Sequence, residues 1–508
     1  MHKSFQGNIV VRDGKIVTLS EGIGFVTIET DENIIRFENA WANPGFTDSH
    51  GHIAALGSKI NGLNLSDALS AEECIEKSKQ HKKFRSDWLT GKGWNNELWK
   101  NKKFPGKEIL DDAFPDIPVH FVRVDGHAAW VNSLALKISG IDKFTLDTYG
   151  GIIERDKSGN PTGILHDNAI DLVKKQIPKY SKKQLKENIK TSLNELVKNG
   201  ITCVHDMDVN PEFLEIYHEL NETNEISIRI FSYVSGHNNE WLNYNVIPSF
   251  SRQLSIVGVK FYADGSLGSR SAAMLEPYTD APNQKGIFLI DEEELLKRST
   301  KALESGFHVA VHAIGDAANR FVLNTYRKLF EKRISDNNSV LRVEHAQHIH
   351  PKDLRLFDRY NIVASVQPVH CISDAATISE KRIGKRCEFA YPWKTLIDNG
   401  ISFISGSDFP IESHNPFLAI DALTRRVPFG GVKSWFENEK LDISTAIDTN
   451  TVNPHEILKS ETKNGELKKG FQADIVILNK NIYQDSEILN THVMATIVDG
   501  KMMYNNTI

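Results

Sequence analysis

Eight short, almost continuous apolar runs constrain the fold of this chain more than any other feature. They alternate with longer amphipathic segments, which is the pattern of parallel strands whose two faces are both covered by helices. Eight strands also close a TIM-type (β/α)8 barrel, so the predicted fold class is α/β with such a barrel. The runs occupy residues 43–50, 201–207, 227–234, 256–265, 307–313, 341–347, 362–368 and 401–408.

The segment between the first two runs is too long for an ordinary crossover connection. It comprises residues 51–200, whereas connections inside a compact domain are usually short. Its last part, residues 181–200, has the apolar periodicity of a helix that stops at Gly200. Much of the rest is rich in aromatic residues and shows no helical or strand periodicity, as in GKGWNNELW. We therefore predict that residues 60–180 form an inserted subdomain over the barrel mouth.

The two ends of the chain have a different pattern. Residues 8–43 and roughly the last forty residues alternate apolar and polar side chains, which is typical of antiparallel strands. Asp499-Gly500 separates two such runs as a hairpin turn would. Residues 1–43 and 455–508 are accordingly expected to form one small β-sandwich domain, with the barrel spanning residues 44–454.

Composition argues against several classes of partner. The 508 residues carry 60 Lys and Arg against 66 Asp and Glu, a net charge of −6, so no overall positive field attracts nucleic acid or an anionic membrane. The four cysteines form no CxxC pair, and no apolar stretch has the length of a signal peptide or a membrane span. We expect a cytoplasmic protein that acts on a small-molecule substrate.

The most informative motif is Asp48-Ser49-His50-Gly51-His52, at the end of the first run. Alternate side chains of a strand share a face, so His50 and His52 point to the same side and could hold one metal ion. Two strand histidines alone would fit a structural role equally well.

Further polar residues lie in or at the ends of other apolar runs: Lys260, His312, His345 and Asp408. The carboxyl ends of barrel strands converge on one rim, and a polar group inside an apolar strand costs several kcal/mol unless it is paired or bound. Their repetition predicts one common site with the histidine pair. Two alternatives stay open: Lys260 could form a buried ion pair with Asp264, and Asp408 could cap a following helix.

Sequence blocks spread over the whole chain carry a specific resemblance. They include NPGFTDSHGHI, GKGWNNELW, FVRVDGHAAWVNS, VKFYADGSLGSRSAAMLEPY, VAVHAIGDAAN, RVEHAQ, ISFISGSDFPIE, TNTVNPHEIL and GELKKGFQADIVIL. Through these blocks the chain resembles the metal-dependent amidohydrolase superfamily, and within it amidohydrolase family 3. It is similar to the YtcJ-like hydrolases and the N-substituted formamide deformylases of that family.

The resemblance implies a binuclear centre of divalent metal ions, usually zinc, with a mononuclear centre as the alternative. His50 and His52 would bind the more buried ion, and His312 and His345 the more exposed one. Lys260 would be carboxylated by CO₂, and the resulting carbamate would bridge both ions.

Asp408 would contact the buried ion and the attacking water. Divalent ions lower the pKa of a bound water from about 15.7 towards about 7 and polarise a substrate carbonyl. A carboxylate beside that water can accept its proton and pass it to the leaving nitrogen, so Asp408 would be general base and then general acid. His127 and His370 would hydrogen-bond the substrate carbonyl or its oxyanion, with a place in the pocket wall as the alternative.

Several residues carry other expectations. Trp94 and Arg270 are candidate substrate contacts, with a core position for Trp94 and a loop anchor for Arg270 as the alternatives. Glu344 directly precedes a histidine of the implied metal set and, because neighbours on a strand face opposite ways, is expected to point away from the metal. His166 and His205 receive no role.

The predicted function is hydrolysis of a C–N bond, in an amide, an N-formyl group or a cyclic amide, by a metal-activated hydroxide. A metal-dependent esterase or other hydrolase on the same site is one alternative, because the barrel and the metal do not determine the leaving group. A non-catalytic scaffold with this fold is another. The resemblance also suggests a homodimer, while the substrate and the identity of the metal stay open.

Overall fold

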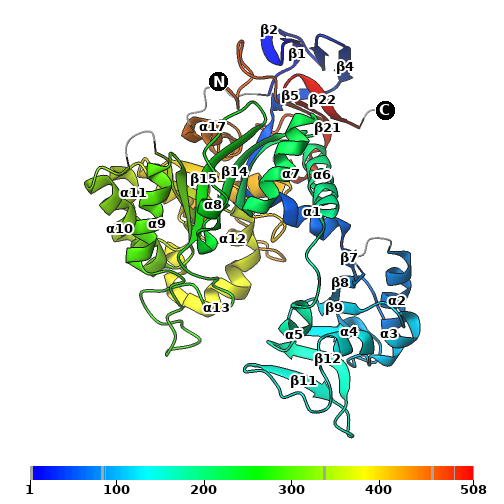
Figure 1. Cartoon of the computed structure of the whole chain (residues 1–508). Coiled ribbons are helices and arrows are strands. Elements are labelled where there is room, and N and C mark those ends of the chain that lie inside the picture. The colour runs from blue at the N-terminus through cyan, green and yellow to red at the C-terminus, as the bar shows by residue number, and fades with distance from the viewer. Residues whose placement is uncertain are drawn as a thin grey trace. The chain divides into compact units, whose positions relative to one another are not determined.

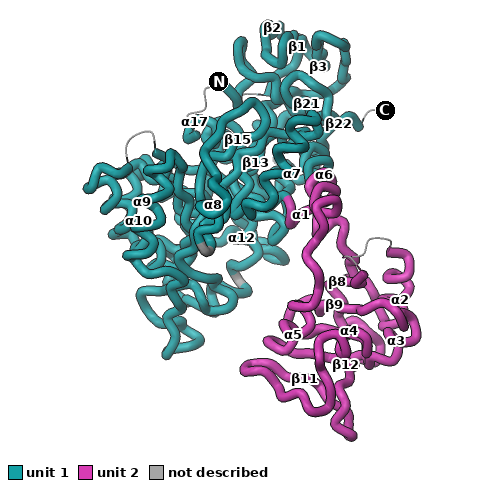
Figure 2. The backbone as a smooth tube through the Cα atoms, viewed as in Figure 1, with its two compact units in different colours: residues 1–53, 192–508 teal, residues 54–191 magenta. Residues whose placement is uncertain are grey.

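The computed structural model describes residues 4–81, 85, 87–335, 339–458, 463–484 and 487–506. The chain divides into two compact units, one made of residues 1–53 and 192–508 and the other of residues 54–191 (Figure 2). The second unit extends beyond both ends of the 60–180 segment that was expected to be an insertion. The first unit holds the barrel together with both chain ends.

The first unit is built around a parallel sheet of eight strands, one from each apolar run (Figure 1). The strands are β6 (Phe46–Gly51), β13 (Ile201–Val209), β14 (Arg229–Ser235), β15 (Leu254–Tyr262), β16 (His308–Ala313), β17 (Leu341–His345), β18 (Val363–Val366) and β19 (Phe403–Ser405). Their spatial order, β19-β18-β17-β16-β15-β14-β13-β6, keeps successive strands adjacent, as in a TIM-type barrel. The predicted α/β barrel is confirmed.

The barrel approaches closure where the carboxyl ends of its first and last strands meet. There the Asp408 N–H donates to the His50 carbonyl at 2.6 Å, and the His52 N–H donates to the Phe409 carbonyl at 2.9 Å. Gly406 passes so close that a Cβ atom on it would lie 2.2 Å from the backbone nitrogen of His50. Backbone geometry therefore draws the HxH motif and Asp408 together.

Helices follow most barrel strands. The main ones are α6 (Lys182–Lys198), α7 (Pro211–Glu222), α9 (Glu292–Glu304), α10 (Asp316–Glu331), α11 (Leu354–Arg359), α12 (Pro368–Asp374), α14 (Trp393–Asp398), α15 (Pro416–Arg425), α16 (Ile443–Asp448) and α17 (Val452–Leu458). Helix α6 confirms the helix predicted before Gly200, and Ile189, Leu193 and Leu196 on its apolar face are buried. Within the described residues, none of the helices is both long and apolar enough to cross a membrane.

Both chain ends contribute four-stranded sheets. One sheet, in the order β2-β1-β3-β4, consists of β1 (Gly7–Arg12), β2 (Lys15–Glu21), β3 (Phe25–Glu29) and β4 (Ile34–Glu38). The other, in the order β22-β21-β20-β5, consists of β5 (Trp41–Pro44), β20 (Ile475–Leu478), β21 (Val493–Val498) and β22 (Lys501–Asn505). Apolar side chains of both sheets, such as Ile9, Val26, Ile475 and Ile497, share one buried cluster.

Two details of these sheets test the sequence predictions. The hairpin turn at Asp499-Gly500 is confirmed, since both residues have positive φ angles, 56° and 77°, and join the antiparallel strands β21 and β22. The expectation that all N-terminal strands are antiparallel is wrong, because β1 and β3 pair in parallel. Strand β2 returns to the start of β1, and the short link after it leads to the other edge of β1, so β3 runs in the same direction as β1.

The second unit has a six-stranded mixed sheet in the order β11-β12-β10-β9-β8-β7. Its strands are β7 (Leu63–Asn64), β8 (Leu89–Trp94), β9 (Val119–Arg123), β10 (Ala128–Val131), β11 (Gly151–Arg155) and β12 (Pro161–Asp167). Helices α2 (Ala71–Gln80), α3 (Glu108–Ala113), α4 (Ser133–Ile138) and α5 (Ile170–Lys174) complete it. Trp94, Trp99 and Trp130 belong to its hydrophobic core. The aromatic residues of this segment therefore form a core within the second unit.

Candidate metal centre

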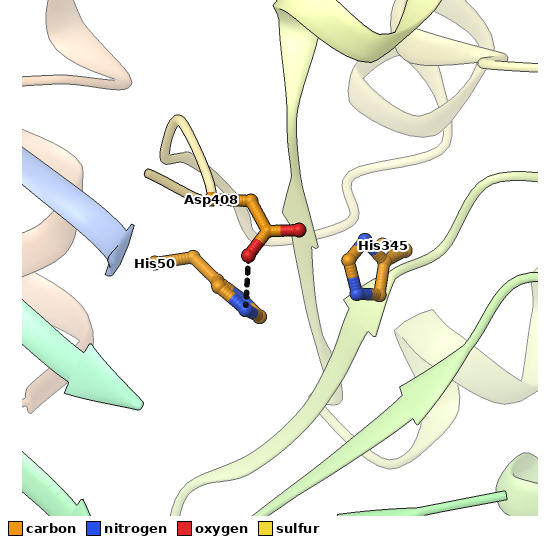
Figure 3. Close-up of side chains that lie close together, drawn as sticks. All are labelled: His50, His345 and Asp408. Atoms are coloured by element: carbon orange, nitrogen blue, oxygen red, sulfur yellow. Dashed lines mark ion pairs between the residues drawn. The ribbon is translucent and has the colours of Figure 1, made fainter. Parts of the chain in front are cut away.

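His50, His345 and Asp408 form the centre of the site (Figure 3). Each residue offers one ligand atom, and these atoms all lie within 4.8 Å of one another. His50 Nε2 lies 3.6 Å from Asp408 Oδ1, and the rings of His50 and His345 are 5.2 Å apart between centroids. All three residues are buried, and the group has the size and the donor atoms to hold a metal ion.

The other predicted ligands surround this group. His52 Nε2 lies 3.0 Å from Asp408 Oδ1, and the His312 ring lies 4.4 Å from the His345 ring between centroids. Burial, together with the nearby positive charge of Lys260, lowers the pKa of His50 to about 4 and that of His312 to about 3. The imidazoles of His50 and His312 are therefore neutral at pH 7, which is the form that binds a metal.

Lys260 is 1% exposed, and no carboxylate of the described residues lies within ion-pair distance of its Nζ. The alternative of an ion pair with Asp264 is wrong. Asp264 instead accepts backbone N–H groups of Ala273, Ile314 and Gly315 at 2.8–3.0 Å, and thereby ties two rim loops together. Burial lowers the pKa of Lys260, so this lysine releases its proton more readily than an exposed lysine does.

Outer contacts orient the two histidines of the HxH motif. His50 Nδ1 donates to Glu344 Oε2 at 2.6 Å, and His52 Nδ1 donates to the carbonyl of Met207 at 2.9 Å. Each contact leaves Nε2 facing Asp408. Metal-binding histidines are held in the same way, through the ring nitrogen that does not bind the ion, so the residues present suit a divalent metal.

Glu344 points towards the site, contrary to the expectation from strand alternation. Alternation requires extended backbone at successive residues, but His345 has φ = 72° and Ala346 has φ = 43°. The left-handed turn at the end of β17 therefore brings His345 to the same side as Glu344. The sequence indicates this turn only weakly: histidine is enriched at positive φ but adopts it rarely, and alanine is not enriched there.

Glu344 belongs to a fully buried charge network inside the barrel. Arg342 Nε lies 2.7 Å from Glu344 Oε1, and both side chains are 0% exposed. The same guanidinium donates to the carbonyl of Ser49 at 2.8 Å and to His205 Nδ1 at 2.9 Å. His205 thus has a structural contact that the sequence did not predict. His166 lies in the second unit, 3.4 Å from Glu154, and takes no part in this network.

Asp408 is held from two sides. His52 Nε2 and His370 Nε2, from helix α12, lie 3.0 Å and 3.3 Å from its two carboxylate oxygens. Although burial opposes it, these contacts keep the pKa of Asp408 well below its usual value, so the carboxylate is ionised at neutral pH. The helix-cap alternative is wrong, because the following helix, α15, is capped by Asn415.

The two expected substrate contacts have other roles. Trp94 is 0% exposed and its indole N–H donates to the carbonyl of Phe121 at 2.9 Å, so it is a core residue of the second unit and has no surface to offer a substrate. Arg270 forms a bidentate pair with Asp280, with contacts of 3.1 Å and 2.9 Å, and anchors its loop. His127 lies on the second unit, exposed and 2.7 Å from Asp167.

A parallel eight-stranded barrel that gathers imidazoles, a carboxylate and a buried lysine at its strand ends has the architecture of a metal-dependent hydrolase. A family model described as the amidohydrolase family matches residues 38–504. The chain therefore belongs to the amidohydrolase family, as its sequence blocks predicted.

Known proteins agree with this assignment. The chain is 32% identical over 515 residues to the YtcJ protein of Bacillus subtilis (strain 168), covering 99% of this chain and 95% of that protein. It is 22% identical over 498 residues to the N-substituted formamide deformylase of Arthrobacter pascens, covering 94% and 91%. A crystal structure of an uncharacterized metal-dependent hydrolase from Pyrococcus horikoshii superimposes with a TM-score of 0.79 at 25% identity, covering 96% and 99%.

Proposed function

We propose that this hydrolase cleaves a C–N bond of a small molecule, in an amide, an N-formyl group or a cyclic amide. The observation that carries the proposal is the position of Asp408, an ionised carboxylate whose oxygens lie within reach of two imidazoles that could hold a metal. A C–N bond requires a proton for its leaving nitrogen, and a carboxylate in this place can supply one. The name of the Arthrobacter deformylase supports the same class of bond.

The residues that would hold the metal are those that converge on the rim: His50, His52, Lys260, His312, His345 and Asp408. We propose two zinc ions and a carbamate on Lys260. The amine of Lys260 is buried, has a lowered pKa and has no carboxylate of the described residues within ion-pair distance, so it suits addition of CO₂, which forms an N–C bond and releases one proton. When bound, the ions lower the pKa of a water and polarise the scissile carbonyl.

Asp408 performs the proton transfers in this proposal. Its carboxylate takes the proton of the attacking water, because it is ionised at neutral pH and His370 holds its orientation. The same oxygen then delivers that proton to the leaving nitrogen. His370 positions Asp408 and, in this proposal, would also donate to the substrate oxygen.

Elemental analysis and a paired substrate panel test the proposal. Protein purified without chelator should contain about two zinc ions per chain. Relative to the uncatalysed reactions, it should accelerate the hydrolysis of N-formyl compounds and amides more than that of the matched esters. Asp408→Asn should lose about 10²- to 10⁴-fold in turnover. A larger acceleration for the esters would establish an esterase, and protein without metal or turnover would establish a non-catalytic scaffold.

A further inference from the structure

The carboxyl end of β13 contains a bulge that includes Asp208. Asp206 pairs with Ser232 and the next paired residue, Val209, pairs with Val234, so β13 has one more residue than β14 across this stretch. Asp208 adopts the left-handed conformation, with φ = 57°. Bulges of this kind re-aim a side chain next to active sites.

The bulge serves the candidate metal centre directly. The carbonyl of Met207, next to Asp208, accepts the hydrogen bond from His52 Nδ1 at 2.9 Å. The left-handed conformation of Asp208 recurs at His345 and at Asp408, with φ = 72° and 59°, where two other strands of the barrel end. Strained backbone concentrates at functional sites, and Asp208 shares this feature with two residues of the central group.

Asp208 faces the side of the site formed by β15 and β16. Its negative charge acts on Lys260 and on Tyr262. Burial is the main cause that raises the pKa of Tyr262, and the charge of Asp208 and a side-chain hydrogen bond between Tyr262 and Asp208 add to it. The Tyr262 ring lies 5.4 Å from the His312 ring between centroids, and Lys260 Nζ lies 4.9 Å from the centre of the Tyr262 ring. Asp208 therefore borders the metal centre on the side of Lys260 and Tyr262.

One oxygen of this carboxylate is buried and has no donor. Asp208 Oδ1 accepts no hydrogen bond from any of the described residues. A buried carboxylate oxygen without a donor is unfavourable, and such atoms at a site mouth are satisfied by a ligand or water. The group that a carboxylate binds most strongly is a positively charged N–H donor.

We propose that Asp208 is a substrate-binding residue that accepts a hydrogen bond from a protonated amino group of the substrate. The inference rests on the proposed function and narrows its substrate class to amides or N-formyl compounds that carry an amine beside the scissile bond. Asp208 binds and orients this amine and takes no part in the proton transfers of Asp408.

Matched substrates and the variant Asp208→Asn test the inference. Asparagine adopts left-handed backbone as readily as aspartate, so the variant retains the bulge. The two substrates share the scissile bond and differ only in an ammonium group or a methyl group at one position. We expect Asp208→Asn to lose about 10- to 100-fold in kcat/KM for the ammonium substrate, mainly through KM, and to retain the wild-type value for the methyl substrate.

Two controls separate the possible outcomes. Asp421→Asn removes a buried carboxylate on α15 and should leave the preference between the substrates unchanged. Asp208→Asn should also contain as much metal as the wild-type. An equal loss for both substrates, or a loss of metal, would overturn the inference in favour of a structural or ligating role.

Measurements of substrate affinity test the inference even if the protein does not catalyse the proposed hydrolysis. Should the wild-type turn over neither substrate, calorimetry with the same two compounds compares their affinities directly. A preference for the ammonium compound that disappears in Asp208→Asn supports the role of Asp208, whereas equal affinities in both proteins overturn it.

Discussion

Replacing Glu344 by glutamine tests whether the buried pair with Arg342 serves the metal centre as well as the fold. The change keeps the shape of the side chain and removes one charge from a pair in which both partners are 0% exposed. Breaking such a pair costs about 3–5 kcal/mol, because the remaining charge is left buried. Since the total stability of a protein is about 5–15 kcal/mol, E344Q should unfold at a clearly lower denaturant concentration.

The chain offers a matched control in the buried pair of Arg229 and Asp474. Their side chains are 1% and 5% exposed, and Arg229 Nε lies 2.5 Å from Asp474 Oδ2. Arg229 begins β14, so this pair lies at the opposite ends of the strands from the metal centre. Asp474→Asn should also destabilise the fold, though less, because Arg229 keeps Asp499 at 3.3 Å.

Metal affinity distinguishes the two variants. His50 Nδ1 donates to Glu344, and loss of such an outer partner lowers metal affinity about 10- to 100-fold. Urea unfolding of both metal-free variants measures stability, and competition with a zinc indicator measures affinity. An E344Q protein that binds zinc as tightly as the wild-type, or a D474N protein that loses as much affinity as E344Q, would refute the reasoning.

Three further substitutions test other parts of the barrel, and a fourth, Gly268→Ala, is the control for the glycine variant. Lys260→Gln should bind fewer metal ions than the wild-type in elemental analysis, because an amide cannot take up CO₂; equal metal contents would contradict the proposed carbamate. His205→Leu removes the acceptor that lies 2.9 Å from Arg342 and should lower the free energy of unfolding by about 1–3 kcal/mol in a urea titration. Gly406→Ala, whose Cβ would lie 2.2 Å from a backbone nitrogen, should cost about 1–3 kcal/mol. Gly268→Ala, whose Cβ has its nearest neighbour at 3.6 Å, should stay within about 0.5 kcal/mol of the wild-type in the same assay.

The barrel and the residues of its central group could be predicted from the sequence for a single reason. Strands buried on both faces leave apolar runs in which a polar residue is conspicuous, and the carboxyl ends of parallel strands meet. His50 and Asp408 stand at the ends of two such runs and His345 lies late in a third, and in the structure their ligand atoms converge. The expected direction of Glu344 was wrong because alternation fails where the backbone of His345 turns left-handed.

Other features depended on contacts between distant segments. Trp94 and Arg270 have residue types that suit substrate binding. In the structure, however, Trp94 is fully buried and the guanidinium of Arg270 is paired with Asp280. The order of strands and the chemistry at their ends follow from the local pattern of apolar and polar residues, which the sequence determines by itself. Only the tertiary structure decided how the buried charges are paired. It also decided that Oδ1 of Asp208 accepts no hydrogen bond from the described residues. The reason is that hydrogen bonds act over a few ångströms, between residues that lie far apart in the chain.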